Sequence, residues 1–195
     1  MQMWLISDSH FWDENIYRFE SFPGGPRVRE RFANAAEGDE YMIMRWNELV
    51  KPEDHIYHLG DVVMEQGNNQ RERFIRLIQS LSGHKRLILG NHDHYDVKLY
   101  REAGFQKVRG SNLLDGVLMT HYPVHPSSIG FKVLVNAHGH IHEKKSPPGP
   151  YVNVSVEAIG YEPIPIEVVK DRAKMLKSIE PVDIRDVQGN VMEGP

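Results

Sequence analysis

The sequence contains no cysteine, and this absence excludes a whole class of sites. Without thiols the 195-residue chain can form neither disulfides nor thiolate metal sites. The sequence also lacks an apolar run long enough to span a bilayer. Its first residues, 1–6, lead directly to the charged Asp8 and do not have the layout of a signal peptide. These absences predict a cytoplasmic protein with no membrane partner.

An excess of positive charge is missing as well. The net charge is −4, and no long block of like charge interrupts the chain. Proteins dedicated to nucleic acids more often have a basic balance or a basic patch. The charge therefore argues against nucleic acid as a partner and favours a small molecule. The sequence gives no indication of the oligomeric state.

Short apolar runs alternate with segments of helical periodicity, a pattern typical of an α/β domain. Helical spacing predicts helices over 42–50, over 74–81 with an end at Gly83, and over 171–179. Residues 22–39 and 144–150 are predicted as loops. We expect one domain over residues 1–180, followed by a C-terminal tail or edge strand over 181–195. The predicted strands cover residues 3–6, 56–59, 86–89, 117–120, 133–137, 151–156 and 164–169.

Histidine is the residue in excess, with eleven copies. Several lie in polar clusters that begin just after a predicted strand ends. Loops at that edge of an open α/β sheet converge, so residues far apart in sequence are expected to meet there. The clusters are Asp8 and His10, Gly60-Asp61, Gly90-Asn91-His92-Asp93, His121, and His138-Gly139-His140-Ile141-His142.

The chemistry of these clusters is coherent. Carboxylate, imidazole and amide donors suit Mn, Fe, Zn and similar divalent ions. Enough donors are present for two metals that share one carboxylate. Alternation along an extended segment places His140 and His142 on the same side, so both can contact one metal pair. The clusters therefore predict a metal centre.

Other histidines and arginines are better explained without a functional role. A single histidine in a strand is more often a packed or surface residue than a ligand, and Arg27, Arg29 and Arg31 are interpreted as part of a solvated loop. Tyr122 and His125, just after His121, are candidates for the rim of a binding site. The histidines interpreted as structural are His55, His58, His84, His94, His125 and His138.

Taken together and in this order, the five clusters resemble the signature of the calcineurin-like metallophosphoesterases. The resemblance implies two mixed β-sheets packed as a sandwich and flanked by helices, in four layers. It also implies that Asp61 bridges the two metals. One metal is then held by Asp8, His10, Asp61 and His142. The second is held by Asp61, Asn91, His121 and His140.

The resemblance further implies that His92 is the general acid and that Asp93 orients it. Asn91 and His121 are also expected to help position the substrate phosphate. A narrower similarity to small bacterial and phage phosphoesterases lies in Asn15-Ile16 and Trp46-Asn47. The sequence departs from those proteins at Trp12-Asp13, where they often have Gly-His, so it does not define the substrate.

The expected function is hydrolysis of a phosphate ester by a hydroxide that bridges two metals. Mn²⁺ is the favoured ion, with Fe, Zn, Ni and Co as alternatives. A phosphodiesterase acting on a small nucleotide, cyclic nucleotides included, is the first interpretation. The alternatives are a phosphomonoesterase or phosphatase, a nuclease, and a non-catalytic scaffold of the same fold. The complete ligand set argues against the scaffold.

Overall fold

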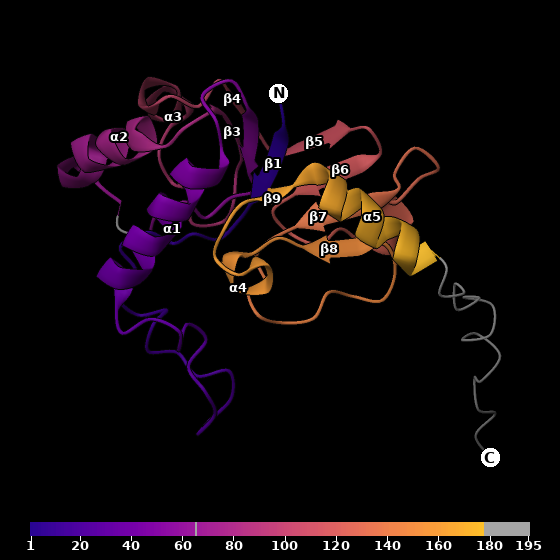
Figure 1. Cartoon of the computed structure of the whole chain (residues 1–195), viewed down its shortest axis with the longest axis horizontal. Helices are drawn as coiled ribbons and strands as arrows, with labels where there is room; N and C mark the ends of the chain where they lie inside the picture. The colour runs from indigo at the N-terminus through magenta and orange to yellow at the C-terminus, as the bar shows by residue number, and fades with distance from the viewer. Residues whose placement is uncertain (65, 178–195) are drawn as a thin grey trace, which may run out of the picture.

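The computed structural model describes residues 1–64 and 66–177 (Figure 1). The predicted tail, residues 181–195, lies outside the described residues. The chain forms two mixed β-sheets, as the family resemblance implied. In the first sheet four strands are parallel and β9 is antiparallel to β1. Its order is β4 (Lys107–Arg109), β3 (His84–Ile88), β2 (His55–His58), β1 (Met3–Ile6) and β9 (Ile164–Pro165).

In the second sheet β5 pairs antiparallel with β6, whereas β6, β7 and β8 are parallel. Its order is β5 (Ser111–Leu114), β6 (Val117–Thr120), β7 (Val135–His138) and β8 (Tyr151–Asn153). The helices are α1 (Ala35–Leu49), α2 (Arg71–Ser80), α3 (Val97–Ala103), α4 (Val156–Ile159) and α5 (Ile166–Lys177), with short 3-10 turns at Asn68–Gln70 and Pro126–Ser128. In the described part of the chain, no helix combines the length and apolar character needed to cross a bilayer.

Alternation of apolar side chains along the central strands produces two hydrophobic cores. Ile6 and Ile56 face α1, α2 and α3, whereas their neighbours Leu5 and Tyr57 face the second sheet. Successive side chains of a strand point to opposite faces, so a strand that is apolar throughout is buried on both. The helices α1–α3 therefore cover the outer face of the first sheet, as Figure 1 shows.

The segment 164–169 was predicted as a strand, and this prediction is wrong beyond Pro165. The alternating Ile164, Ile166 and Val168 resemble a strand, but α5 begins at Ile166. Ile166, Val169 and Ala173 share one helical face and are buried in the core between the sheets, while Val168 is exposed. Burial of that face decides between the two periodicities. Figure 1 shows α5 beside β7 and β8, which it contacts together with β9 and β1.

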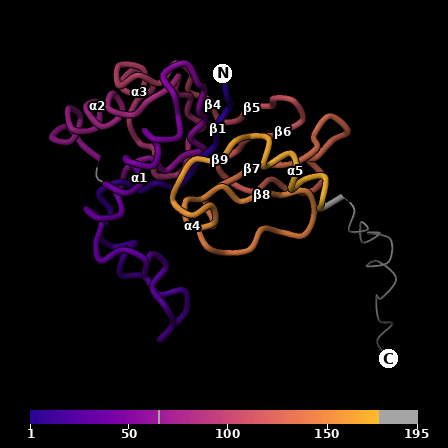
Figure 2. Tube along the Cα trace, in the orientation of Figure 1, coloured from indigo at the N-terminus to yellow at the C-terminus, as the bar shows by residue number. Residues whose placement is uncertain are grey.

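The segment before α1 is shorter than predicted, because the helix begins at Ala35. The Asn34 side chain accepts a hydrogen bond from the Glu37 N–H (3.0 Å), and the Glu37 carboxylate accepts one from the Ala33 N–H (2.7 Å). These reciprocal bonds satisfy N–H groups at the helix start. The preceding chain, indigo in Figure 2, extends away from the two sheets below α1. In α2 the predicted end also differs: the helix stops at Ser80, and Gly83 occupies the following turn with φ +86°.

Candidate metal centre

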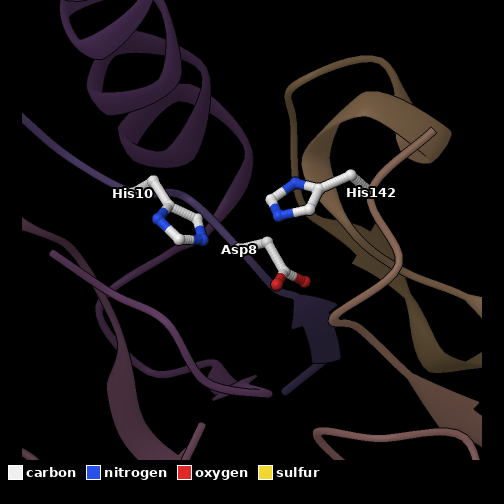
Figure 3. Close-up of side chains that lie close together, drawn as sticks. All are labelled: Asp8, His10 and His142. Atoms are coloured by element: carbon white, nitrogen blue, oxygen red, sulfur yellow. The ribbon is translucent and has the colours of Figure 1, made fainter. Parts of the chain in front are cut away.

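Two groups of ligand side chains lie where strands of both sheets end. The first cluster is Asp8, His10 and His142, and the second cluster is Asp61, His121 and His140. Within each cluster the ligand atoms all lie within 4.8 Å of one another. Figure 3 shows the Asp8 carboxylate between the imidazole rings of His10, which follows β1, and His142, which follows β7. The topology therefore brings together residues separated by more than a hundred positions.

Asp61 connects the two clusters. Its Oδ2 atom lies 3.5 Å from His10 Nε2 and 3.3 Å from His121 Nε2, so one carboxylate oxygen contacts a ligand of each cluster. Burial alone would raise the pKa of Asp61, but the neighbouring His10 and His121 rings and the His92 N–H hold the pKa well below its usual range. An ionised carboxylate in this position has the geometry of a bridging metal ligand.

Asn91 belongs with the second cluster, because its Oδ1 atom lies 2.9 Å from His121 Nε2. His121 Nδ1 lies 2.8 Å from the carbonyl oxygen of Leu59, which can only accept, so Nδ1 carries the proton in the neutral ring. The Nε2 lone pair then faces Asp61 Oδ2 and Asn91 Oδ1. Three acceptor atoms converge there, an arrangement that a cation stabilises.

His10 provides a second sign that the site is built for a cation. His10 is 3% exposed, and neither of its ring nitrogens has a hydrogen-bond partner among the described residues. A buried polar atom left unpaired costs about 1–3 kcal/mol. A divalent ion between Asp8, His10 and His142 would give one of the two His10 nitrogens a partner. The residues present therefore fit two divalent ions with oxygen and imidazole ligands.

Five of the predicted ligands have left-handed backbone conformations, which are unusual for residues other than glycine. Each such residue costs roughly 1–3 kcal/mol and persists only where neighbouring groups hold it. This strain marks the clusters as built for a task other than stability. The residues and φ angles are Asp8 (57°), His10 (46°), Asp61 (57°), His140 (72°) and His142 (52°).

Asp93 holds the turn at Asp61. Its carboxylate accepts hydrogen bonds from the backbone N–H groups of Asp61 (2.9 Å), Val62 (3.1 Å) and Gly90 (2.8 Å). This differs from the expectation that Asp93 orients the ring of His92, because no hydrogen bond within residues 1–64 and 66–177 joins the two side chains. The strained Asp61 turn needs an acceptor for its N–H groups, and Asp93 supplies it. Asp93 therefore acts on the site through Asp61.

Close packing around the ligands explains two of the glycines. A Cβ atom at Gly90 would lie 2.2 Å from Asp61 Oδ1, and one at Gly139 would lie 2.2 Å from Asp8 Oδ2. Asp8 itself accepts hydrogen bonds from the His140 N–H (3.0 Å) and the Ser155 hydroxyl (2.9 Å). A larger side chain at either glycine would displace a ligand carboxylate.

His92 lies beside both clusters, in a partly exposed position. Its ring centroid is 5.4 Å from that of His10, and its backbone N–H donates to Asp61 Oδ1 (2.8 Å). The ring is thus near the candidate ligands, while its backbone N–H holds the Asp61 carboxylate. This location is compatible with proton transfer to a bound substrate.

Sequence reasoning missed three buried side chains around the ligands, those of Asp13, Arg29 and Glu157. Asp13 has one oxygen 3.7 Å from His10 Nδ1, and the other accepts the Asn15 N–H (2.9 Å). Arg29, interpreted from sequence as solvated, is fully buried, with its donors bonded to Glu157 and to backbone carbonyls. A single Arg or Glu in a polar stretch carries no periodic signal. Only the position of Asp13, three residues after His10, offered a clue.

Asp39 of α1 is a buried carboxylate next to the first ligand segment. Its Oδ2 atom accepts the Trp12 N–H (2.9 Å), while Oδ1 has no partner among the described residues. Burial raises the pKa of Asp39 from 3.8 to about 7, against the opposing effects of the Trp12 N–H, Arg29 and Arg73. The folded protein therefore binds this proton more tightly than the unfolded chain. The resulting stability is complete below about pH 4 and is lost as the pH rises through 7.

Asp39→Asn is expected to remove this pH dependence, because Asn keeps the acceptor for Trp12 without a buried charge. The free energy of unfolding of the variant minus that of wild type should increase by about 2 kcal/mol as the pH rises from 5.5 to 8.5. Thermal or urea unfolding of both proteins in the presence of a chelator measures the difference. Glu40→Gln, at an exposed position of the same helix, is the control. A constant difference between Asp39→Asn and wild type across this range would refute the assignment.

Two mixed sheets with paired carboxylate, imidazole and amide ligands at the ends of their strands define a metallophosphoesterase. Comparison with known families agrees: the pattern of the calcineurin-like phosphoesterase family matches residues 1–189. The chain belongs to this family. Membership implies metal-dependent hydrolysis of phosphate esters, and members of the family typically bind divalent metals.

Individual relatives are distant. An uncharacterized protein of Methanocaldococcus jannaschii is 27% identical over 188 residues, which cover 91% of this chain and 96% of that protein. A protein of unknown function from Aquifex aeolicus, known from its crystal structure, is 27% identical to this chain, with a TM-score of 0.66. The match covers 88% of this chain and 98% of the Aquifex chain. A nuclease of Pseudomonas putida is 18% identical, with a TM-score of 0.44, and the match covers 72% of this chain and 61% of the nuclease chain.

Proposed function

We propose that this protein is a two-metal phosphodiesterase that acts on a small nucleotide, cyclic nucleotides included. The observation that carries the proposal is the position of Asp61 Oδ2, within 3.5 Å of His10 and 3.3 Å of His121. A carboxylate shared in this way keeps two cations close together, and a closely spaced metal pair is typical of enzymes that cleave phosphate esters. Mn²⁺ is the ion that we expect to support activity best.

Each residue of the site has a defined task in this proposal. Asp8, His10 and His142 hold one ion, and Asn91, His121 and His140 hold the other, with Asp61 contacting both. When bound, the metals supply the Lewis acidity that activates water and stabilises negative charge on the phosphoryl oxygens. His92 donates a proton to the leaving oxygen, which is a poor leaving group as an alkoxide. Asn91 and His121 also orient the phosphate.

A longer nucleic acid substrate is the second candidate, and one feature favours it. A cavity of about 370 Å³ adjoins the segment that follows His142 and is lined by Lys144, Lys145 and Arg172. None of the three forms an ion pair with another described residue. Cations of this kind could bind a further phosphate. The overall acidic charge favours the small ester.

An activity screen after metal exchange separates these candidates. The protein is treated with a chelator, reconstituted with Mn²⁺, Fe²⁺, Zn²⁺, Ni²⁺ or Co²⁺, and offered 2′,3′- and 3′,5′-cyclic nucleotides, dinucleotides, single-stranded oligonucleotides and phosphomonoesters. We expect Mn²⁺-dependent hydrolysis of cyclic or dinucleotide diesters, and the same preparation of Asp8→Ala controls for contaminating enzymes. Hydrolysis of oligonucleotides alone would favour the nuclease. Absence of hydrolysis with every ion would support the scaffold.

The segment 22–39 is proposed to influence substrate choice, because loops on a rigid scaffold often carry specificity. Its tip is a turn in which Ser21 N–H donates to the Pro26 carbonyl (2.9 Å), and Phe22 is 62% exposed. Replacing residues 22–25 with a shorter turn should change the ratio of rates on cyclic and monoester substrates without changing metal content. Phe131→Ala, at another exposed aromatic, is the control. An unchanged ratio would identify the tip as a connection only.

A further inference from the structure

Arg29 is the largest charged side chain enclosed in the described structure, with 0% exposure. It lies in the segment between β1 and α1, yet its guanidinium reaches the backbone of the first ligand segment. Nη2 donates to the carbonyl oxygen of Asp8 (2.7 Å), and Nη1 donates to that of Ser9 (2.9 Å) and to the Tyr17 hydroxyl (3.3 Å). The two bonds to backbone carbonyl oxygens fix the chain at Asp8 and at its neighbour Ser9.

The remaining donor of Arg29 connects to the opposite side of the first cluster. Arg29 Nε lies 2.8 Å from Oε1 of Glu157, in the first turn of α4, and the Glu157 side chain is 2% exposed. The same oxygen lies 3.2 Å from His142 Nδ1. A carboxylate can only accept here, so Nδ1 donates and Nε2 is left free as the ligand atom.

Burial of this ion pair is not explained by stability. Removing two charges from water costs several kcal/mol for each ion, and buried pairs can often be replaced by apolar residues without loss. Arg29 and Glu157 are 128 positions apart in the sequence. Their ion pair nevertheless connects the backbone at Asp8 with the side chain of His142. It also adds hydrogen bonds at Asp8, whose backbone is left-handed. Its effect is therefore concentrated on the first cluster.

We propose that Arg29 and Glu157 are positioning residues of the metal centre, which set the geometry and affinity of the first cluster. Glu157 orients the His142 ring, and Arg29 fixes the Asp8–Ser9 backbone while neutralising Glu157. This inference rests on the proposed metal centre and extends it to the segment before α1, whose folding becomes coupled to metal binding. A carboxylate that orients a ligand imidazole typically changes metal affinity by about 10–100-fold.

Metal titration of three variants tests the proposal without any substrate. Mn²⁺ binding to chelator-treated protein is followed by calorimetry, and unfolding of the metal-free protein is followed in parallel. Glu157→Ala should weaken one of the two Mn²⁺ sites by about 10–100-fold and leave the other closer to wild type. Glu157→Gln, which keeps an acceptor for His142, should recover much of that loss. Arg29→Met should weaken the same site and destabilise the metal-free protein, because Glu157 is left buried without its cation.

The double variant Arg29→Met/Glu157→Ala separates positioning from stability. With both charges removed, the metal-free stability should return toward wild type, whereas Mn²⁺ binding at the weakened site should stay low. The partly exposed pair Arg45 and Glu162 (2.7 Å) is the matched control, and Arg45→Met/Glu162→Gln should leave Mn²⁺ binding unchanged. Wild-type affinity in the double variant or in Glu157→Ala would overturn the proposal. If Arg29→Met does not fold, Mn²⁺ binding by Glu157→Ala and Glu157→Gln still tests the positioning role.

These outcomes are independent of the proposed reaction. A protein that binds two Mn²⁺ ions, loses one site in Glu157→Ala and hydrolyses none of the esters would retain the positioning role and reject the activity. A protein that hydrolyses esters but shows unchanged metal binding in Glu157→Ala and in the double variant would reject the positioning role alone.

Discussion

Asp61→Ala is expected to abolish binding of the metal pair and to lower the rate of phosphate ester hydrolysis by about 10³-fold or more. One oxygen of this carboxylate lies within 3.5 Å of His10 and within 3.3 Å of His121. Its removal takes a ligand from both ions and leaves their mutual repulsion less compensated. The other oxygen accepts the His92 N–H, so the backbone of His92 also loses a hydrogen-bond partner.

Asp8→Ala is the comparison, because Asp8 belongs to the first cluster only. This variant should lose one ion and retain the second at reduced affinity. Elemental analysis and Mn²⁺ titration of both variants measure the difference. Two ions bound to Asp61→Ala at wild-type affinity would show that Asp61 does not bridge them.

His92→Ala is expected to affect the rate according to the leaving group of the substrate. On a diester with an alkoxide leaving group, loss of a positioned acid should lower the rate by about 10²–10⁴-fold. On a nitrophenyl ester the decrease should be much smaller, because that group leaves without a proton. Both metals should remain bound, since the contact of His92 with Asp61 is made by the backbone N–H, which alanine retains.

The ratio of the two decreases is the informative quantity, because it does not depend on enzyme concentration or on partial loss of metal. His94→Ala is the matched control, since His94 is exposed and its ring lies 6.3 Å from that of His92. Equal decreases on both substrates would remove His92 from the acid role and assign it to phosphate positioning.

The sequence indicated the candidate ligands because each follows a short apolar strand, and the structure groups six of them in two clusters. Parallel strands that end at one edge bring such residues together whatever the length of chain between them. Asp8 and Asp61 follow the adjacent parallel strands β1 and β2, so their proximity could be predicted in this way, whereas His121 follows β6 of the second sheet and its approach depends on how the two sheets pack. The two mixed sheets were implied by the family resemblance, and the structure confirms them.

The residues that hold those ligands could not be predicted in the same way. Arg29 and Glu157 lie in irregular or short segments, and their roles depend on one contact between positions 128 apart. Asp93 was expected to orient the His92 ring, but its hydrogen bonds are to the backbone at Asp61, Val62 and Gly90. The start of α5 depended on which face of Ile166–Ala173 is buried between the sheets. Each of these features is set by tertiary contacts, which local patterns do not contain.

The central claim is that two divalent ions act together in one phosphoesterase site. Its most direct test is a titration of metal-free protein with Mn²⁺ in which bound metal and hydrolysis of a nitrophenyl diester are measured on the same samples. The account predicts that binding saturates at two ions per chain and that activity rises mainly with the second ion. Saturation at one ion per chain, with full activity at that point, would contradict it.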